Sequence, residues 1–82
     1  MPEGSTTAAP LTEVVAARLR AMVTEGQLTP GQRLSEARLS GELGISRNTL
    51  REVFRLLTRE GLARYEPNRG VSVAVPSIAA II

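Results

Sequence analysis

The sequence of 82 residues contains no cysteine, histidine, lysine or aspartate, and its only aromatic side chains are Phe54 and Tyr65. Without cysteine no disulfide or thiolate nucleophile can form, and without histidine the most common metal ligand and general base are both missing. The sequence also shows no glycine-rich phosphate loop and no paired-carboxylate arrangement. We therefore expect a protein that is not an enzyme and that holds neither a metal nor a cofactor.

Long apolar stretches are missing as well. The longest apolar runs comprise only a few residues, whereas about 20 are needed to span a bilayer, and the N-terminus lacks the basic and then apolar pattern of a secretion signal. We expect a cytoplasmic chain that makes no contact with a membrane. At 43% apolar content the chain can bury one small core, so we expect a single domain.

The charged residues are ten arginines and eight glutamates, which give a net charge of +2. From Arg33 to Arg69 there are eight arginines and five glutamates, a balance of +3, whereas the residues before Arg33 have a balance of −1. A basic C-terminal half fits an anionic partner such as nucleic acid. Many solvated surfaces have a similar balance, so the charge alone only favours such a partner.

Residues 1–10 are small and polar and are expected to form a flexible arm. From Leu11 onward, apolar residues recur at spacings of three and four, which predicts an amphipathic helix that ends near Gly26. The apolar positions of this helix are Leu11, Val14, Val15, Leu19 and Met22.

Two serines mark the expected starts of two further helices. Ser35 can cap a helix over residues 36–43 that Gly44 ends, and Ser46 can cap a helix that runs from Arg47 to about Glu60. In this third helix the spacing of apolar residues predicts one buried face, which consists of Leu50, Val53, Phe54 and Leu57.

The segments 62–66 and 71–75 have the composition of strands, and the turn sequence between them predicts a β-hairpin. Residues 32–34 are expected to be an extended connector. This order of elements predicts an α+β fold that is mainly α, a winged helix-turn-helix with three helices and a two-stranded hairpin wing over residues 11–76. Residues 77–82 are expected to begin a linker to an absent C-terminal effector domain.

A tight turn between two short helices requires a small residue at the crossing, a residue that tolerates positive φ, and an apolar plug. Ser40, Gly44 and Ile45 meet these requirements in order. An ordinary corner between two helices has the same requirements. The turn alone therefore favours neither a DNA-binding helix-turn-helix nor an ordinary helical corner.

The third helix begins with residues that suit a DNA groove. Arg47 and Arg51 offer planar forks for guanine, Asn48 can pair with adenine, and Thr49 can reach a phosphate or a thymine methyl group. The exposed N–H groups at the start of the helix favour phosphate. The alternative is a solvated ladder of arginines along the helix. The like charges of such a ladder repel one another and destabilise the helix unless an anion binds beside them. We therefore favour DNA contact for Arg47 and Arg51.

Other arginines allow two interpretations each. Arg59 lies far from the groove end of the helix, and we interpret it as a solvated residue. Arg38 can pair with Glu42 or clamp a phosphate, and we favour the clamp. At the expected hairpin tip, Asn68, Arg69 and Gly70 form either a solvated turn or a probe of the minor groove. A phosphate contact by Arg33 is a weaker expectation.

Four segments carry a resemblance to a known family. They are residues 28–39 (LTPGQRLSEARL), 43–52 (LGISRNTLRE), 59–62 (REGL) and 67–71 (PNRGV). Over residues 11–76 the chain resembles the DNA-binding domain of the GntR family of bacterial transcription regulators, most closely the FadR-like branch.

The resemblance implies a sequence-specific regulator, expected to be a repressor, that binds double-stranded operator DNA as a homodimer. It implies that the third helix enters the major groove and the wing enters the minor groove. It further implies principal base and phosphate contacts by Arg38, Arg47 and Arg51, with Ser46 and Thr49 on the backbone and Asn68, Arg69 and Gly70 in the wing. Members of the family carry a C-terminal effector-binding and dimerising domain, which nothing in this sequence represents.

Two other kinds of binding protein remain as alternatives. A winged helix can serve as a protein-protein docking module, with the apolar residues 78–82 in its interface. Residues 41–44 (GELG) also have the form of the GXXG loop of RNA-binding KH domains. There, Glu42 would repel the backbone that the loop must clamp, and the expected strand order differs, so this alternative is disfavoured.

Overall fold

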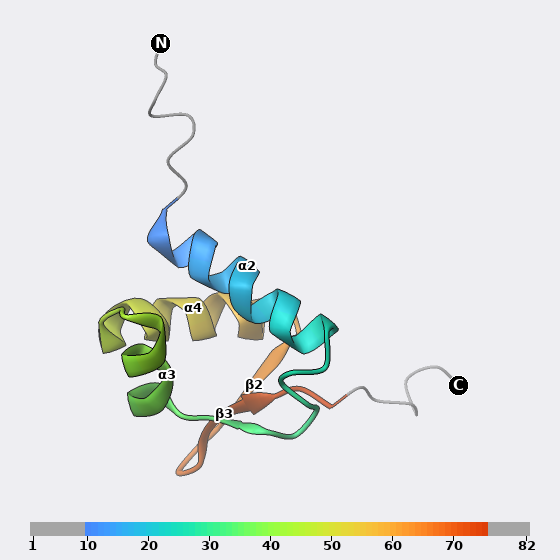
Figure 1. Ribbon diagram of the computed structural model, residues 1–82. Helices are drawn as coiled ribbons and strands as arrows, with labels where there is room; N and C mark the ends of the chain where they lie inside the picture. Colours follow the sequence, from blue (N-terminus) through green and yellow to red (C-terminus); the bar gives the residue numbers. More distant parts are fainter. Residues whose placement is uncertain (1–9, 76–82) are drawn as a thin grey trace.

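The computed structural model describes residues 10–75 of the chain. The helices are α2 (Leu11–Thr24), α3 (Glu36–Leu43) and α4 (Arg47–Arg59), and the strands are β1 (Arg33–Leu34), β2 (Ala63–Glu66) and β3 (Gly70–Val73) (Figure 1). The arm expected over residues 1–10, apart from Pro10, and the linker expected over residues 77–82 lie outside the described residues.

Two serine caps define the helix-turn-helix. The Ser35 hydroxyl accepts a hydrogen bond from the Arg38 N–H at 3.2 Å at the start of α3, and the Ser46 hydroxyl accepts one from the Thr49 N–H at 3.0 Å at the start of α4. Gly44 ends α3 in the left-handed conformation at φ 68°, which glycine adopts without strain. The capping residues predicted from the sequence are therefore confirmed.

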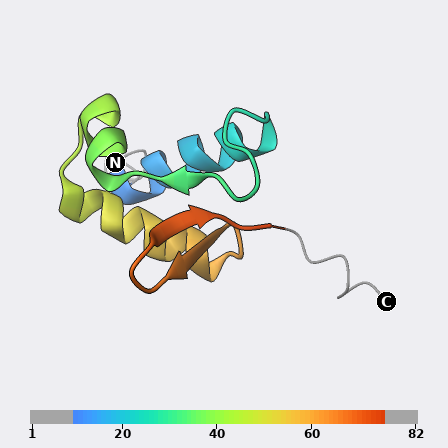
Figure 2. The ribbon, with the colours of Figure 1, turned by 90° about the horizontal axis from the view of Figure 1, so that it is seen from below.

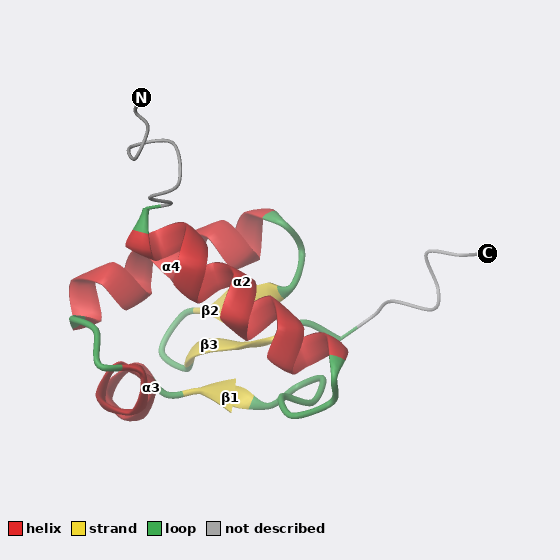
Figure 3. Ribbon diagram, turned by 45° about the horizontal axis from the view of Figure 1, so that its top comes forward, coloured by secondary structure: helices red, strands yellow, loops and turns green. Residues whose placement is uncertain are grey.

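The sheet has three strands, whereas the sequence predicts a hairpin of two. Its order is β1-β3-β2, and both pairings are antiparallel (Figure 3). β1 belongs to the segment 32–34, which the sequence predicts to be an extended connector. The turn before it places this segment along the free edge of β3, where Val73 donates a backbone hydrogen bond to Gln32 at 2.8 Å. Exposed backbone groups at a strand edge pair readily with any extended segment alongside, which explains the third strand.

The core forms around the apolar face of α4. Leu50, Val53, Phe54 and Leu57 are all buried, as the spacing predicts. The other buried side chains come from α2, α3, the loop after α2 and the three strands, and they are Val15, Ala16, Leu19, Leu28, Leu34, Leu39, Ala63 and Val73. α4 therefore contacts α2 on one side and the sheet on the other.

On α2 the buried stripe differs from the predicted one. Val15 and Leu19 are buried as expected, but Leu11 and Val14 are each 53% exposed. Ala16 is fully buried, and Val23 packs partly against the core. The stripe is thus rotated about the helix axis toward the smaller Ala16, because a small side chain allows α2 to approach α4 closely.

Within residues 10–75, no helix combines the length and apolar content needed to cross a membrane.

We predict that Phe54→Ala lowers the free energy of unfolding by about 3 kcal/mol or more, because it removes a large buried side chain and leaves a cavity. Domains are stable by only about 5–15 kcal/mol, so the loss should be severe in a chain of this size. Urea denaturation followed by circular dichroism measures the change. Tyr65→Ala is the matched control, because Tyr65 is 64% exposed and its loss should change stability little. Equal effects of both substitutions would contradict the assignment of the core.

Candidate nucleic-acid interface

The end of the molecule that carries α3 also carries the start of α4 and the tip of the hairpin. The two views at right angles agree on this arrangement (Figures 1 and 2). The turn between α3 and α4 and the loop between β2 and β3 are thus presented together, although more than 20 residues of sequence separate them. A single extended partner can touch both.

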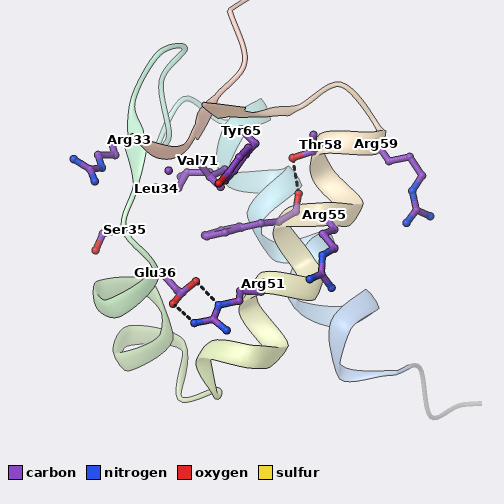
Figure 4. Close-up of a pocket in the computed structure, with 12 residues that line it drawn as sticks. Arg33, Leu34, Ser35, Glu36, Arg51, Arg55, Thr58, Arg59, Tyr65 and Val71 are labelled. Atoms are coloured by element: carbon purple, nitrogen blue, oxygen red, sulfur yellow. Dashed lines mark hydrogen bonds and ion pairs between the residues drawn. The ribbon is translucent and has the colours of Figure 1, made fainter. Parts of the chain in front are cut away.

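Between these elements lies a hollow of about 1110 Å³, walled by the exposed side of α4, the start of α3 and the sheet (Figure 4). The charged residues that line it are Arg33, Glu36, Arg51, Arg55 and Arg59. We call this hollow the basic basin, since four arginines face one carboxylate. Such a concave surface of one dominant sign attracts anions.

The first turn of α4 exposes Arg47 and Asn48 to solvent. Arg47 makes no ion pair with another residue of the described range. Beside them, the Ser46 hydroxyl donates to the Thr49 hydroxyl at 2.9 Å, in addition to its capping bond. This arrangement leaves the hydrogen of the Thr49 hydroxyl available to an external acceptor.

One turn further along α4, Arg51 is held by Glu36 of α3. Its Nε donates to Oε2 at 2.9 Å and its Nη2 donates to Oε1 at 3.3 Å, as the dashed lines in Figure 4 show. The Arg51 side chain remains 56% exposed, while that of Glu36 is 30% exposed. The pair therefore links the two helices of the turn without burying the guanidinium.

The Arg51–Glu36 pair shifts the titration of both groups. The hydrogen bond from Arg51 is the largest cause that lowers the pKa of Glu36. Burial opposes it, and the positive charges of Arg51 and Arg47 add to the lowering. The hydrogen bond to Glu36 likewise raises the pKa of Arg51. Both groups are thus stabilised in their charged forms.

The remaining arginines of α4 differ in their partners. Arg55 pairs with Glu52, three residues earlier on the same helix, at 3.4 Å. Glu60 does not neutralise this row of arginines, because it forms two hydrogen bonds to Arg20 of α2, at 3.0 and 2.9 Å. Arg59, interpreted from sequence as a solvated residue remote from the site, lines the basic basin.

Arg38 lies on the exposed side of α3 and does not line the basin. Its Nε donates to Glu42 at 3.0 Å, and both side chains are well exposed. The ion pair considered from the sequence is therefore present in this chain. Exposed pairs of this kind contribute little to stability, so Arg38 can exchange Glu42 for a phosphate at small cost.

At the hairpin tip, Asn68 and Gly70 adopt positive φ values of 69° and 89°. Arg69 donates a backbone hydrogen bond to the Glu66 carbonyl at 3.0 Å, which closes the turn and leaves the arginine side chain exposed. A second hollow of about 300 Å³ joins the tip to Arg33 of β1. A Cβ at Gly70 would lie 4.0 Å from the Arg33 guanidinium, so Arg33 extends alongside the tip.

Sequence analysis missed two features of this surface. Tyr65 is largely exposed and lines the basin, although only its place on a strand is apparent from sequence. The proximity of Arg33 to the tip depends on the pairing of β1 with β3, for which two residues give no local signal. Among residues 10–75 there is no group of three or more acidic, histidine or cysteine residues that could hold a metal ion.

Three helices, a steep turn and a hairpin that flanks the third helix define a winged helix-turn-helix protein. Comparison with known proteins identifies the family. The profile described as "Bacterial regulatory proteins, gntR family" matches residues 11–73. The chain belongs to the gntR family of bacterial regulatory proteins.

Similar proteins include two curated relatives. The HTH-type transcriptional regulator YdhC of Bacillus subtilis is 36% identical over 56 residues, which cover 68% of this chain and 25% of the relative. A regulator from an unstable DNA locus of Streptomyces ambofaciens is 42% identical over 57 residues, which cover 70% of this chain and 24% of the relative. The chain thus spans about a quarter of the length of these relatives.

Solved structures agree with this assignment. A protein of Rhodococcus sp. RHA1 assigned as a transcriptional regulator GntR is 44% identical, with a TM-score of 0.81 over 85% of this chain and 34% of that one. A structure described as AraR(DBD) in complex with operator ORR3 is 25% identical, with a TM-score of 0.73 over 82% of both chains.

We predict that the Glu36 carboxyl titrates at a higher pH in Arg51→Gln than in the wild type, because the variant loses the charged hydrogen bond that lowers its pKa. Arg47→Gln is the graded control, since Arg47 contributes only its charge and should produce a smaller shift in the same direction. Carbon-13 NMR of the side-chain carboxyl carbon follows both. A wild-type titration identical to that of Arg51→Gln would show that the pair does not form in solution.

The direction of the pKa shift also fixes how this pair affects stability. Because the pKa of Glu36 is lower in the folded chain, the pair stabilises the fold above the ordinary carboxyl pKa. Its contribution is lost as the pH falls through the lowered value.

Proposed function

We propose that this chain is the DNA-binding module of a transcription regulator of the FadR-like branch. α4 would lie in the major groove of an operator and the hairpin tip in the adjacent minor groove. The observation that carries the proposal is the joint exposure of Arg47 and Asn48 at the start of α4, at the same end of the molecule as the hairpin tip. A helix N-terminus and a wing presented at the same end of the molecule suit one duplex that offers a major groove to the helix and the neighbouring minor groove to the wing.

In the major groove, the first turn of α4 carries the base-reading chemistry. Arg47 and Arg51 offer forks to guanine O6 and N7, and Asn48 offers an amide to adenine. Ser46 and Thr49 lie where the unpaired N–H groups of the helix start point outward. The Thr49 hydroxyl, whose hydrogen is available, and these N–H groups suit a phosphate oxygen, and the Ser46 hydroxyl would join them by turning its hydrogen away from Thr49. Arg38 would reach the same strand once it releases Glu42.

The basic basin suits the sugar–phosphate strand that separates the two grooves. Arg33, Arg55 and Arg59 line it from opposite walls, and the exposed Tyr65 hydroxyl adds a hydrogen-bond donor. Asn68, Arg69 and Gly70 would then enter the minor groove, where the absence of a Gly70 side chain allows close approach of the backbone.

The proposal extends to the whole protein of which such a module is a part. It would act as a homodimer, without enzymatic activity of its own, and repress transcription when two modules occupy neighbouring half-sites. The dimerising and effector-binding functions would reside in the additional length that the relatives possess. Binding to chromosomal DNA would place the protein in the cytoplasm.

A protein-docking module is the second candidate, because Leu11, Val14 and Val75 expose apolar side chains. The two candidates differ in their response to salt. Arginines that neutralise phosphates release the counterions bound to DNA, so the affinity for DNA falls steeply as the salt concentration rises. A docking module does not bind DNA and shows no such dependence.

We predict that the wild-type chain binds a labelled duplex, and that the logarithm of its binding constant falls linearly with the logarithm of salt concentration. Arg47→Ala should reduce the magnitude of this slope by about 1, because the positive charge of Arg47 no longer neutralises a phosphate. Fluorescence anisotropy between low and physiological salt measures the slope. Arg18→Ala removes an arginine that is also exposed but belongs to α2, outside the proposed interface, and it should leave the slope unchanged. Equal effects of both substitutions, or no binding by the wild type, would reject the proposed interface.

A further inference from the structure

Glu36 is the only carboxylate among the residues that line the basic basin. A negative charge on a surface that faces phosphates weakens attraction to every DNA sequence. The pair with Arg51 offers little stability in return, because more than half of the Arg51 side chain is exposed to water. Glu36 also lies in the first turn of α3, where a carboxylate interacts favourably with the helix dipole. This interaction does not require contact with Arg51. Neither affinity for DNA nor the helix dipole therefore accounts for the two hydrogen bonds that Glu36 accepts from Arg51.

The geometry of the pair indicates a different role. A guanidinium has five N–H donors in one plane, and Glu36 accepts from Nε and from one hydrogen of Nη2. Both carboxylate oxygens are used, so the plane and the direction of the group are fixed. The hydrogens that remain, on Nη1 and on the outer side of Nη2, form a second fork on the edge away from Glu36. Two parallel acceptors can bind this outer fork while the pair stays intact.

We propose that Glu36 is a specificity-determining positioning residue, which holds Arg51 across the α3–α4 turn so that the outer fork of the guanidinium presents to a single base. This inference rests on the proposed function. The acceptor that fits the outer fork is a guanine, whose O6 and N7 lie side by side in the major groove.

The Glu36 carboxylate also changes how much Arg51 contributes to the affinity for other DNA sequences. An arginine free to rotate can follow any nearby phosphate, whereas Arg51 is fixed in direction and has a neighbouring negative charge. Binding to a random duplex therefore gains less from Arg51 than binding to a site with guanine in the matching position. Arg47 provides the contrasting case of a positive charge that has no ion pair with another described residue.

The test is selection from a pool of duplexes with a randomised central segment at low salt, followed by sequencing. The wild type should enrich guanine at one position of the site, and Arg51→Ala should lose this preference. Glu36→Gln should lower the same preference about fivefold or more, while it binds the unselected pool as tightly as the wild type or more tightly. In the Arg51→Ala background, Glu36→Gln should have no further effect on this position.

Two further variants separate the effect of the orientation of Arg51 from the effect of the negative charge of Glu36. Glu36→Asp keeps the charge but shortens the side chain, so it should lower the guanine preference without a gain in affinity for the unselected pool. Glu52→Gln removes an equal charge from the neighbouring Arg55 pair. It should tighten binding to the pool and leave base preferences unchanged. Thermal unfolding of each variant checks that it remains folded.

The outcomes distinguish this inference from the function on which it depends. Wild-type guanine preference in both Glu36→Gln and Glu36→Asp, together with its loss in Arg51→Ala, would overturn the positioning role and leave the DNA-binding module standing. A loss of preference in Glu52→Gln as large as that in Glu36→Gln would also overturn it, since charge alone would then explain the effect. Failure of the wild type to enrich any duplex would overturn both proposals.

Discussion

The burial of one face of α4 determines the rest of this structure. Leu50, Val53, Phe54 and Leu57 lie at spacings that place them on a single side of the helix, and all four are buried. Because the helix cannot rotate without exposing them, the arginines on its other side must face outward. The same constraint forms one wall of the basic basin and fixes the direction in which the first turn of α4 points.

Much of this fold can be predicted from sequence because its signals are local. A serine before α3, a serine before α4 and a glycine after α3 give the bounds of α3 and the start of α4 without reference to the rest of the chain. The errors concern contacts between distant segments. β1 exists only because β3 offers a free edge, and the rotation of the α2 stripe toward Ala16 depends on how closely α2 approaches α4.

The candidate site shows the same difference between local contacts, which the sequence predicts, and contacts between distant segments, which it does not. The pair between Arg38 and Glu42 lies on one helix at a fixed spacing, so sequence alone suggests it. The pair between Arg51 and Glu36 spans 15 residues and depends on the crossing of α3 and α4, which no local pattern encodes. Arg33 approaches Gly70 only through the third strand. Residue types at the site are thus apparent from sequence, whereas their partners follow from tertiary structure.

The distribution of ion pairs explains how a net charge of only +2 can serve an anionic partner. Glu60 is paired with Arg20 between α2 and α4, away from the basin, so its negative charge is offset there. The arginines with no ion pair to another described residue are Arg18, Arg33, Arg47, Arg59 and Arg69. Four of these five lie in the basin, at the start of α4 or at the hairpin tip. Unpaired charges act over about a Debye length, near 10 Å at moderate salt, so their placement matters more than the total.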